Sequence, residues 1–455
     1  MFHKRIAKFV KIFHLKVKTI EKERVNLITL GCSKNWVDSE NIITQLQAND
    51  IPVAHEADGS EAEVVIVNTC GFIDLAKEES INTILEYAAA KSRNEIRKLY
   101  VTGCLSQRYR DDLQKEIPEV DAWFGTMELP GLLAKFKVDY RHELLGERKI
   151  TTPLHYAYLK ISEGCNRTCS FCAIPLMRGQ HVSRSIEDLV GEARSLARQG
   201  VKEIMLIAQE LTYYGLDLYK ERRLADLLEA LSGVDGIEWI RLHYAYPSKF
   251  PVNILEAMAK LPKVCTYLDM PLQHADDRVL ERMRRQITRA ETEELITTAR
   301  RIVPDLTLRT TFLVGYPGET EEEFEVLCDF VRRMEFDRVG VFQYSHEEDT
   351  RAYLMEDDVP AEIKEQRANR IMEIQREISL NKNLSRVNRV EQVLIDRFES
   401  GCYFGRSKGD SPEVDNEVII DASEGYLRIG DFVQVLITEA TEYDVYGVLS
   451  DVQDD

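Results

Sequence analysis

Short apolar runs alternate with helical patterns over the first third of the chain. Three runs have the length and composition of buried strands: Val25–Leu30, Val64–Val67 and Leu99–Thr102. Residues 39–47, 76–90 and 106–115 place apolar side chains at helical spacing. Strands that alternate with helices predict an open parallel α/β sheet over residues 25–140, with ligands at the carboxyl ends of the strands.

A cysteine follows each of these predicted strands, at Cys32, Cys70 and Cys104. Because parallel strands end at one edge of a sheet, three thiols can meet there and bind an iron–sulfur cluster. Tens of residues separate the cysteines along the chain. The alternative therefore stays open that the three thiols only cap their strands and never meet.

Charged residues follow Cys32 closely. Lys34, Asp38 and Glu40 could contact a ligand at the same edge. Acidic residues also stabilise the start of a helix through its dipole. For Asp38 and Glu40 we favour this structural role.

Six further strand-like runs occur between residues 151 and 360. They are Tyr156–Ile161, Glu203–Ala208, Trp239–His243, Thr266–Met270, Leu306–Val314 and Arg338–Tyr344. Helical patterns separate them, as in 186–199, 224–231, 275–284, 290–301 and 321–334. Six βα units in succession predict a parallel barrel that is open on one side, with its active groups at the carboxyl ends of the strands.

The first of these strands leads into a loop with the sequence Cys165-Asn-Arg-Thr-Cys169-Ser-Phe-Cys172. Three thiolates on one small loop can bind three irons of a cubane cluster, which leaves the fourth iron without a protein ligand. A structural zinc site needs a fourth ligand, and none follows closely. We therefore favour an iron–sulfur cluster over zinc at this loop.

Polar residues and glycines follow the other strands at the same predicted rim. They are Gln209, Glu210, His243, His274, Gly315, Gly318 and Glu319. Glycines let the backbone approach a ligand closely. The two histidines could act as acid, base or metal ligand, although a hydrogen-bonded rim histidine is the more common role. Phe171, inside the cysteine loop, could stack on a purine or pack at the barrel mouth.

The C-terminal region has a different pattern. Residues 361–383 predict a long amphipathic helix. Short alternating runs at 391–395, 418–420, 432–437 and 446–449, separated by glycine turns, predict a small antiparallel β barrel. From residue 387 onward, sixteen Asp or Glu and five Arg or Lys give a net charge of −11. Such a barrel would attract a basic protein rather than nucleic acid, although a solvated acidic surface without a partner is the alternative.

Composition narrows the class of protein. A chain of 455 residues is long enough for about three domains. The net charge of −19 argues against a general nucleic-acid binder, and no apolar run is long enough to span a bilayer. Nine cysteines, an odd number, do not suit a disulfide scaffold, so we expect a reducing cytoplasm and incidental roles for Cys265, Cys328 and Cys402. Residues 1–24 form a basic extension with eight Lys or Arg, in which Ile6–Phe13 has helical spacing.

Taken together, these motifs resemble a known family. The C-x3-C-x2-C loop at Cys165 is similar to the signature of radical S-adenosylmethionine enzymes, and the preceding trio resembles the methylthiotransferases among them. Residues 31–40 (GCSKNWVDSE), 68–74 (NTCGFID) and 270–275 (MPLQHA) resemble the RimO branch, which modifies an aspartate of the decoding-centre ribosomal protein S-twelve. The tRNA-modifying MiaB branch usually differs in all three stretches. Ser33 departs from the proline typical of the RimO branch, but this position is not a ligand.

The resemblance implies an arrangement of domains and cofactors. Beyond the extension, it implies a methylthiotransferase domain (25–140), a radical S-adenosylmethionine domain (151–386) and a TRAM domain (387–455), a family usually linked to RNA binding. It also implies two [4Fe–4S] clusters. The radical-generating cluster would be bound by Cys165, Cys169 and Cys172, and the auxiliary cluster by Cys32, Cys70 and Cys104.

The resemblance further implies a reaction. One S-adenosylmethionine would donate a methyl group to sulfur, and another would yield the radical that removes a β-hydrogen from the aspartate. Gln209, Glu210, Gly315, Gly318 and Glu319 would contact S-adenosylmethionine. The implied partners are protein S-twelve and a reducing electron donor. There are two alternatives. The substrate could be an adenosine in tRNA, or the chain could be an iron–sulfur protein without catalytic activity.

Overall fold

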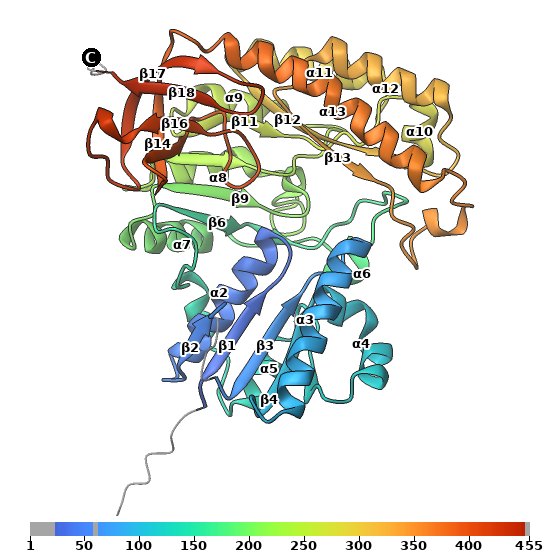
Figure 1. Ribbon diagram of the computed structural model, residues 1–455, viewed down its shortest axis with the longest axis vertical. Helices are drawn as coiled ribbons and strands as arrows, with labels where there is room; N and C mark the ends of the chain where they lie inside the picture. The colour runs from blue at the N-terminus through green and yellow to red at the C-terminus, as the bar shows by residue number, and fades with distance from the viewer. Residues whose placement is uncertain (1–22, 58–61, 451–455) are drawn as a thin grey trace, which may run out of the picture.

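Three separate sheets organise the computed structural model, which describes residues 23–57 and 62–450. In Figure 1 the N-terminal sheet lies below a central barrel, and a small C-terminal barrel lies beside the central one. The helical spacing at Ile6–Phe13 lies outside the described residues. Within the described residues, no helix is long and apolar enough to cross a membrane.

The first sheet contains five parallel strands. They are β1 (Val25–Thr29), β2 (Val53–His55), β3 (Val64–Thr69), β4 (Lys98–Gly103) and β5 (Ala122–Trp123). Their order is β2-β1-β3-β4-β5, and apolar clusters cover both faces. The helices are α2 (Ser33–Gln47), α3 (Asp74–Ser92), α4 (Cys104–Glu116) and α5 (Leu129–Lys135). The predicted parallel sheet is confirmed, and the two edge strands that periodicity missed have three and two residues.

The central sheet contains the six predicted parallel strands. They are β6 (Tyr156–Lys160), β9 (Glu203–Ile207), β10 (Trp239–Leu242), β11 (Val264–Asp269), β12 (Thr307–Val314) and β13 (Arg338–Gln343). Their order is β13-β12-β11-β10-β9-β6, so β6 and β13 are the edges of an open barrel. The helices are α7 (Ile186–Arg198), α8 (Leu224–Ser232), α9 (Val252–Lys260), α10 (Asp277–Arg282), α11 (Arg289–Ile302) and α12 (Glu321–Met334). Their apolar faces pack against the strands in one large core.

Short elements surround the cysteine loop that follows β6. A two-stranded antiparallel ribbon, β7 (Ser162–Glu163) and β8 (Val182–Ser183), flanks it, and α6 (Ile174–Arg178) follows Cys172. Short 3-10 helices occupy His142–Gly146, Leu211–Tyr213, Ala352–Leu354 and Ala422–Glu424. The ribbon holds the two ends of the cysteine loop next to each other.

The C-terminal barrel follows the long helix α13 (Ala361–Leu384). Its strands are β14 (Val390–Glu399), β15 (Cys402–Arg406), β16 (Val418–Asp421), β17 (Phe432–Ala440) and β18 (Val445–Leu449). They close in the order β14-β15-β16-β18-β17. Four pairs are antiparallel and β16–β18 is parallel. A closed ring with an odd number of strands requires at least one parallel pair, which is the departure from the predicted antiparallel barrel.

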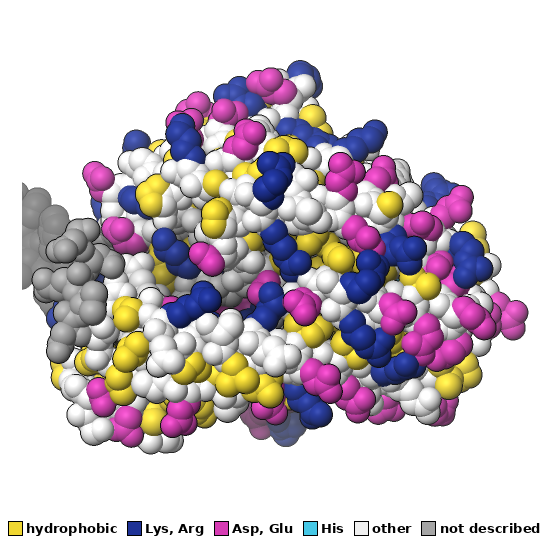
Figure 2. Space-filling view, turned by 90° about the horizontal axis from the view of Figure 1, so that it is seen from above, with side chains coloured by type: hydrophobic (Ala, Val, Ile, Leu, Met, Phe, Trp, Pro, Cys, Tyr) yellow, Lys and Arg dark blue, Asp and Glu magenta, His cyan; other side chains and the backbone are white. Residues whose placement is uncertain are grey.

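The loop between β15 and β16 docks against side chains from inside the central barrel. Arg241 donates to the Lys408 carbonyl at 2.7 Å, and Tyr267 donates to Asp415 at 2.7 Å. Other acidic residues of the small barrel pair in the same region, including Asp396, Asp410 and Glu413. Part of the acidic charge counted in the sequence is therefore used within the molecule, and Figure 2 shows both signs of charge interspersed on the face seen from above.

A buried ion-pair network joins the first sheet to the central barrel. Arg148, in the connecting segment, contacts Glu40 of α2 and bonds to Glu192 of α7 at 2.9 Å. The three side chains are at most 2% exposed. Glu40 also accepts the Thr151 backbone N–H at 2.7 Å. Because buried charges must be paired, this network fixes α2 against the barrel.

Replacing Arg148 should therefore be costly. In Arg148→Met the buried Glu40 loses its cation, whereas Glu192 keeps its pair with Arg184. We expect a loss of about 3–5 kcal/mol, measured as a lower midpoint of unfolding in urea. The control, Arg93→Ala, breaks the exposed Arg93–Glu95 pair and should leave the midpoint unchanged. Adding Glu40→Gln to Arg148→Met should recover part of the loss. Equal midpoints for Arg148→Met and Arg93→Ala would contradict this role.

Candidate functional site

The first three cysteines lie on neighbouring loops at the carboxyl edge of the N-terminal sheet. Cys70 directly follows β3, and Cys104 directly follows β4. Gly31, before Cys32, has φ +89°, and a Cβ atom there would lie 2.8 Å from the Cys70 Sγ. A Cβ atom at Gly71 would lie 2.8 Å from the Leu105 backbone. Glycine is therefore required for the Cys70 loop to pack against both other cysteine loops.

Asn35 ties these loops together. Its Nδ2 donates to the carbonyls of Leu30 at 2.8 Å and Thr69 at 2.9 Å, at the ends of β1 and β3. Its Oδ1 accepts from Arg178 and lies 3.8 Å from the Cys104 Sγ. One buried amide thus spans the edge on which the thiols meet.

The three thiols also influence one another electrostatically. Burial raises the pKa of Cys104 to about 12, Arg178 opposes this, and Cys32 and Cys70 add to it. Burial also raises the pKa of Cys70, and Cys32 contributes there. The structure thus brings Cys32, Cys70 and Cys104 to one place, in contrast to the alternative of separate capping thiols.

The second trio lies on the loop after β6, at the carboxyl end of the central barrel. The loop is pinned at Cys165, whose N–H donates to the Gly179 carbonyl at 3.1 Å, and at Ser170, whose N–H donates to the Met283 carbonyl at 3.1 Å. Burial raises the pKa of Cys165 to about 11 and that of Cys172 to about 12, and Cys169 adds to both shifts. The thiols therefore lie close enough to interact.

Polar donors surround Cys169. The Arg285 Nη1 donates to its Sγ at 3.3 Å, and the Tyr246 hydroxyl lies 3.7 Å from it. Hydrogen bonds to ligand sulfurs help set the potential of a cluster. Sequence reasoning missed Arg285 and Tyr246, because they come from separate loops without a motif.

Arg167, within the cysteine loop, connects this trio to the next strand end. Its guanidinium lies 3.9 Å from the Tyr213 ring centroid and 3.8 Å from that of Tyr246. It bonds to Glu210 at 3.0 Å, and Glu210 also accepts the Thr212 N–H. Glu210, a predicted cofactor contact, therefore holds Arg167 in place.

The two trios face each other across α6. Ala173 and Met177 pack in one apolar cluster with Cys104. At the end of α6, Arg178 bonds to Asp38 of α2 at 2.6 Å. The helix that follows the second trio therefore packs directly on the first trio.

The donor set suits clusters rather than single ions. Over the described residues, no three His, Cys, Asp or Glu side chains form a site for one metal ion. In a cubane each thiolate binds a different iron, so the ligands spread around a larger group. Two sets of three interacting thiols fit two such cubanes, each with one iron left for another ligand.

The other predicted rim residues differ in whether their polar groups are already hydrogen-bonded within the protein. Gln209 donates to Glu163 at 2.7 Å, while its buried Oε1 has no partner among the described residues and can accept from a ligand. The 315–319 turn is held by α13 and the segment before it. Glu319 accepts from Arg367 at 3.1 Å, and the Gly318 N–H donates to Asp358 at 2.7 Å. Lys364 packs over Gly315, which has φ +71°.

Buried carboxyl and imidazole groups at the rim have shifted pKa values. Burial raises the pKa of Glu319 to about 7 against the opposing effect of Arg367. Burial lowers the pKa of His274 to about 3, and its Nδ1 accepts from the Asp276 N–H. Burial, aided by Arg241, also lowers the pKa of His243 well below its usual range, and His243 bonds to Ser411 at 3.1 Å. Both histidines are therefore neutral hydrogen-bonded groups.

The structure corrects the interpretation of Asp38 and Glu40 as helix-start residues and shows where Phe171 lies. Helix α2 begins at Ser33, so Asp38 and Glu40 do not lie at its start. Asp38 instead pairs with Lys160 of β6, and Glu40 pairs with Arg148 of the connecting segment. Phe171 packs in the apolar cluster of the barrel mouth.

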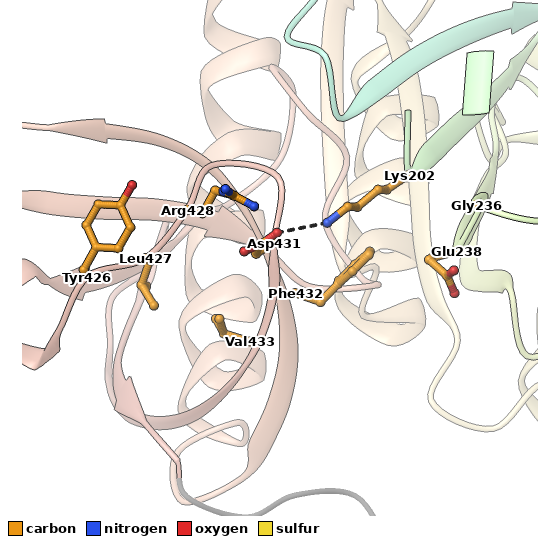
Figure 3. Close-up of a pocket in the computed structure, with 9 residues that line it drawn as sticks. All are labelled: Lys202, Gly236, Glu238, Tyr426, Leu427, Arg428, Asp431, Phe432 and Val433. Atoms are coloured by element: carbon orange, nitrogen blue, oxygen red, sulfur yellow. Dashed lines mark hydrogen bonds and ion pairs between the residues drawn. The ribbon is translucent and has the colours of Figure 1, made fainter. Parts of the chain in front are cut away.

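A separate pocket lies away from the cysteines. It has a volume of about 640 Å³ and lies between the central and C-terminal barrels (Figure 3). Lys202 and Glu238 line it and precede β9 and β10, so it opens at the amino ends of the strands. The cysteine trios lie at the carboxyl ends, and the pocket is not part of their site.

Comparison with known proteins agrees with this arrangement. Residues 24–125 match the family described as "Uncharacterized protein family UPF0004", residues 159–331 the "Radical SAM superfamily" and residues 387–449 the "TRAM domain". A relative from Flavobacterium johnsoniae, named "Ribosomal protein uS12 methylthiotransferase RimO", is 59% identical over 434 residues, 95% of this chain and 99% of the relative. The relative of the same name from Christiangramia forsetii is 58% identical over 95% of this chain and 96% of the relative.

The chain belongs to the RimO family. This confirms the resemblance drawn from the cysteine motifs and the stretches at 31–40, 68–74 and 270–275. Solved structures support the fold alone. The radical S-adenosylmethionine methyltransferase TsrM from Kitasatospora setae matches with a TM-score of 0.52 at 15% identity, over 71% of this chain and 75% of TsrM. The radical enzyme OxsB matches with a TM-score of 0.52 at 13% identity, over 76% of this chain and 56% of OxsB.

The thiols of the iron-free protein should differ in reactivity. Cys32 is exposed, whereas Cys104 is buried and its pKa is raised to about 12. Because the thiolate is the nucleophile, iodoacetamide at pH 8 should alkylate Cys32 well before Cys104. Peptide mass spectrometry over a time course measures both rates.

Two controls accompany this labelling. Cys265, buried away from both trios, should also react slowly in the folded protein. In urea all three cysteines should react at similar rates. Equal rates for Cys32 and Cys104 in the folded protein would contradict the described environment of the first trio.

Proposed function

We propose that the protein is a radical S-adenosylmethionine enzyme that attaches a methylthio group to the β-carbon of an aspartate in ribosomal protein uS12, called S-twelve above. The observation that carries this proposal is the 59% identity to a relative named for that activity, over 95% of this chain. The two facing cysteine trios support it, because the reaction needs both a radical and a sulfur atom.

Two [4Fe–4S] clusters would be held by the two trios. When bound, a reduced cluster at Cys165, Cys169 and Cys172 would supply the electron that cleaves S-adenosylmethionine, and a cluster at Cys32, Cys70 and Cys104 would supply or carry sulfur. A reducing electron donor is required as a partner. The net change replaces a β C–H bond by a C–S–CH3 group, with one S-adenosylmethionine as methyl donor and another as radical source.

The chain's own residues would bind and orient the reactants. Gln209 donates to Glu163, just before the cysteine loop, and its free Oε1 would accept a hydrogen bond from S-adenosylmethionine. Arg167, fixed by Glu210 and two tyrosine rings, would fix the shape of that side of the site. Gly315, Gly318 and Glu319 are proposed cofactor contacts through their backbone, because their turn is held on its other side by α13. Phe171 would complete the wall of the barrel mouth.

We also propose one role for each of the three domains. Residues 25–140 would hold the auxiliary cluster, 151–386 would generate the radical, and the TRAM domain, 387–455, would contact the substrate protein. Because part of its acidic charge faces the central barrel, the remaining exposed acidic groups would meet basic uS12. A tRNA adenosine is the less favoured substrate, since phosphate-binding grooves are positive.

Deleting the gene should remove the modification from uS12. Tryptic peptides of uS12 from wild-type cells should carry the methylthio mass on one aspartate, and those from the deletion strain should lack it. Mass spectrometry measures the fraction modified, and a plasmid copy of the gene should restore it.

Nucleoside analysis of bulk tRNA from the same strains separates the alternative substrate. We expect unchanged methylthioadenosines in the deletion strain. A modified uS12 aspartate that persists without the protein would overturn the proposed function, and a loss confined to tRNA would favour the alternative.

A further inference from the structure

Lys34 is a buried cation in the gap between the two cysteine trios. It lies in the first turn of α2, two residues after Cys32, and is 8% exposed. Its Nζ lies 3.2 Å from the ring centroid of Tyr244, which follows β10 at the carboxyl rim of the barrel. One side chain thus reaches from the first trio to the barrel mouth.

The neighbouring cations at this gap are already neutralised. Lys160 pairs with Asp38 and with Glu163 at 2.6 Å, and Arg178 pairs with Asp38 at 2.6 Å. Lys34 has no carboxylate within 4.0 Å in the part of the chain that the structure describes. The tyrosine ring stabilises its charge only in part, and a buried ammonium without a counter-ion is unfavourable.

The carboxylates near Lys34 are bound to other groups and do not form an ion pair with it within 4.0 Å among the described residues. Asp269, which accepts the Tyr244 N–H at 3.3 Å, pairs with Arg309 at 3.2 Å. His243 is buried and bonded to Ser411. The cluster around the Tyr244 ring also contains Tyr156 and Tyr158. Their hydroxyls donate to the Glu413 carboxylate at 3.1 and 3.2 Å, so this carboxylate is bound to the tyrosines and not to Lys34. Lys34 is therefore left without a direct counter-ion among the described residues, and a bound anion can supply one.

We propose that Lys34 binds the carboxylate of the aspartate that is methylthiolated. The inference rests on the proposed function, which brings an aspartate side chain into this gap. The reacting β-carbon is bonded directly to the carboxyl carbon, so an anchor on the carboxylate fixes the β-carbon within one bond. Because Lys34 adjoins Cys32 and touches the barrel rim, this anchor holds the β-carbon between the two trios.

A positive anchor also makes the site selective for a charged substrate. Asparagine has nearly the same shape as aspartate but no charge to pair with the ammonium. Losing one partner of a buried charge pair weakens binding by about tenfold or more. Lys34 would therefore be the residue that distinguishes aspartate from asparagine.

The test compares two forms of purified uS12, one with the target aspartate and one with asparagine in its place. Dissociation constants are measured for the cluster-loaded wild-type enzyme and for Lys34→Met, Lys34→Arg and Lys260→Met. Wild type should bind the aspartate form about tenfold more tightly or better. Lys34→Met should lose this preference, Lys34→Arg should keep part of it, and Lys260→Met, which removes an exposed lysine of α9, should keep all of it.

Two further measurements separate the remaining explanations. If Lys34 only fastens α2 to the barrel through its ring contact, Tyr244→Leu should abolish the preference as fully as Lys34→Met does, and the proposal fails. If Lys34→Met instead weakens binding of S-adenosylmethionine, the bound carboxylate is that of the cofactor, and the proposal also fails. If the thermal midpoint shows that Lys34→Met does not fold, the same dissociation constants are measured for Lys34→Gln.

Different outcomes would overturn the proposed function and the role of Lys34. A wild-type enzyme that leaves the uS12 aspartate unmodified overturns the proposed function, and this inference with it. A wild-type enzyme that modifies uS12 but binds both forms equally, or a Lys34→Met variant that keeps the preference, overturns the role of Lys34 alone.

Discussion

Buried ion pairs between helix α2 and the central barrel hold the carboxyl ends of two parallel sheets against each other. Arg148 pairs with Glu40, and Asp38 pairs with Lys160 and Arg178. Ligands of parallel α/β folds bind at these strand ends, so the ion pairs turn two half-sites into one. Because the charges are buried, they stabilise only this relative orientation of the sheets.

The same constraint explains the chemistry of the gap. Five of the six thiols are buried or partly buried, and α6 lies between the two trios. Interactions between charges are stronger in such a partly buried site than in bulk water. A cation left without a counter-ion there, as Lys34 is, gives the site its preference for an anionic side chain. The C-terminal barrel completes the arrangement by filling the inside of the central barrel from its other end.

Much of this fold could be predicted from the sequence because strands buried on both faces are continuous apolar runs. All six strands of the central barrel and three of the first sheet follow that pattern. Three other strands do not show this apolar pattern, because they are short or contain polar residues and glycine. They are β2, β5 and β15. The places of the six cysteines in the fold were predictable because each lies just after a strand or in a compact motif.

The surroundings of the cysteines were not predictable in the same way. Arg285 and Tyr246 reach Cys169 from separate loops, and no local spacing marks them. The prediction that Asp38 lies at the start of a helix was wrong, because its ion pair joins elements more than 100 residues apart. Charge counted along the sequence also overstated the acidic surface of the C-terminal barrel, since burial and pairing depend on tertiary contacts.

The most direct test of two sites with separate tasks is to remove one ligand from each trio. Cys169→Ala should abolish cleavage of S-adenosylmethionine to 5′-deoxyadenosine and with it the methylthio product. Cys70→Ala should keep measurable cleavage but yield no methylthio product. Iron analysis should find the other cluster assembled in each variant. Equal loss of cleavage in both variants, with the untouched cluster intact in each, would contradict the account.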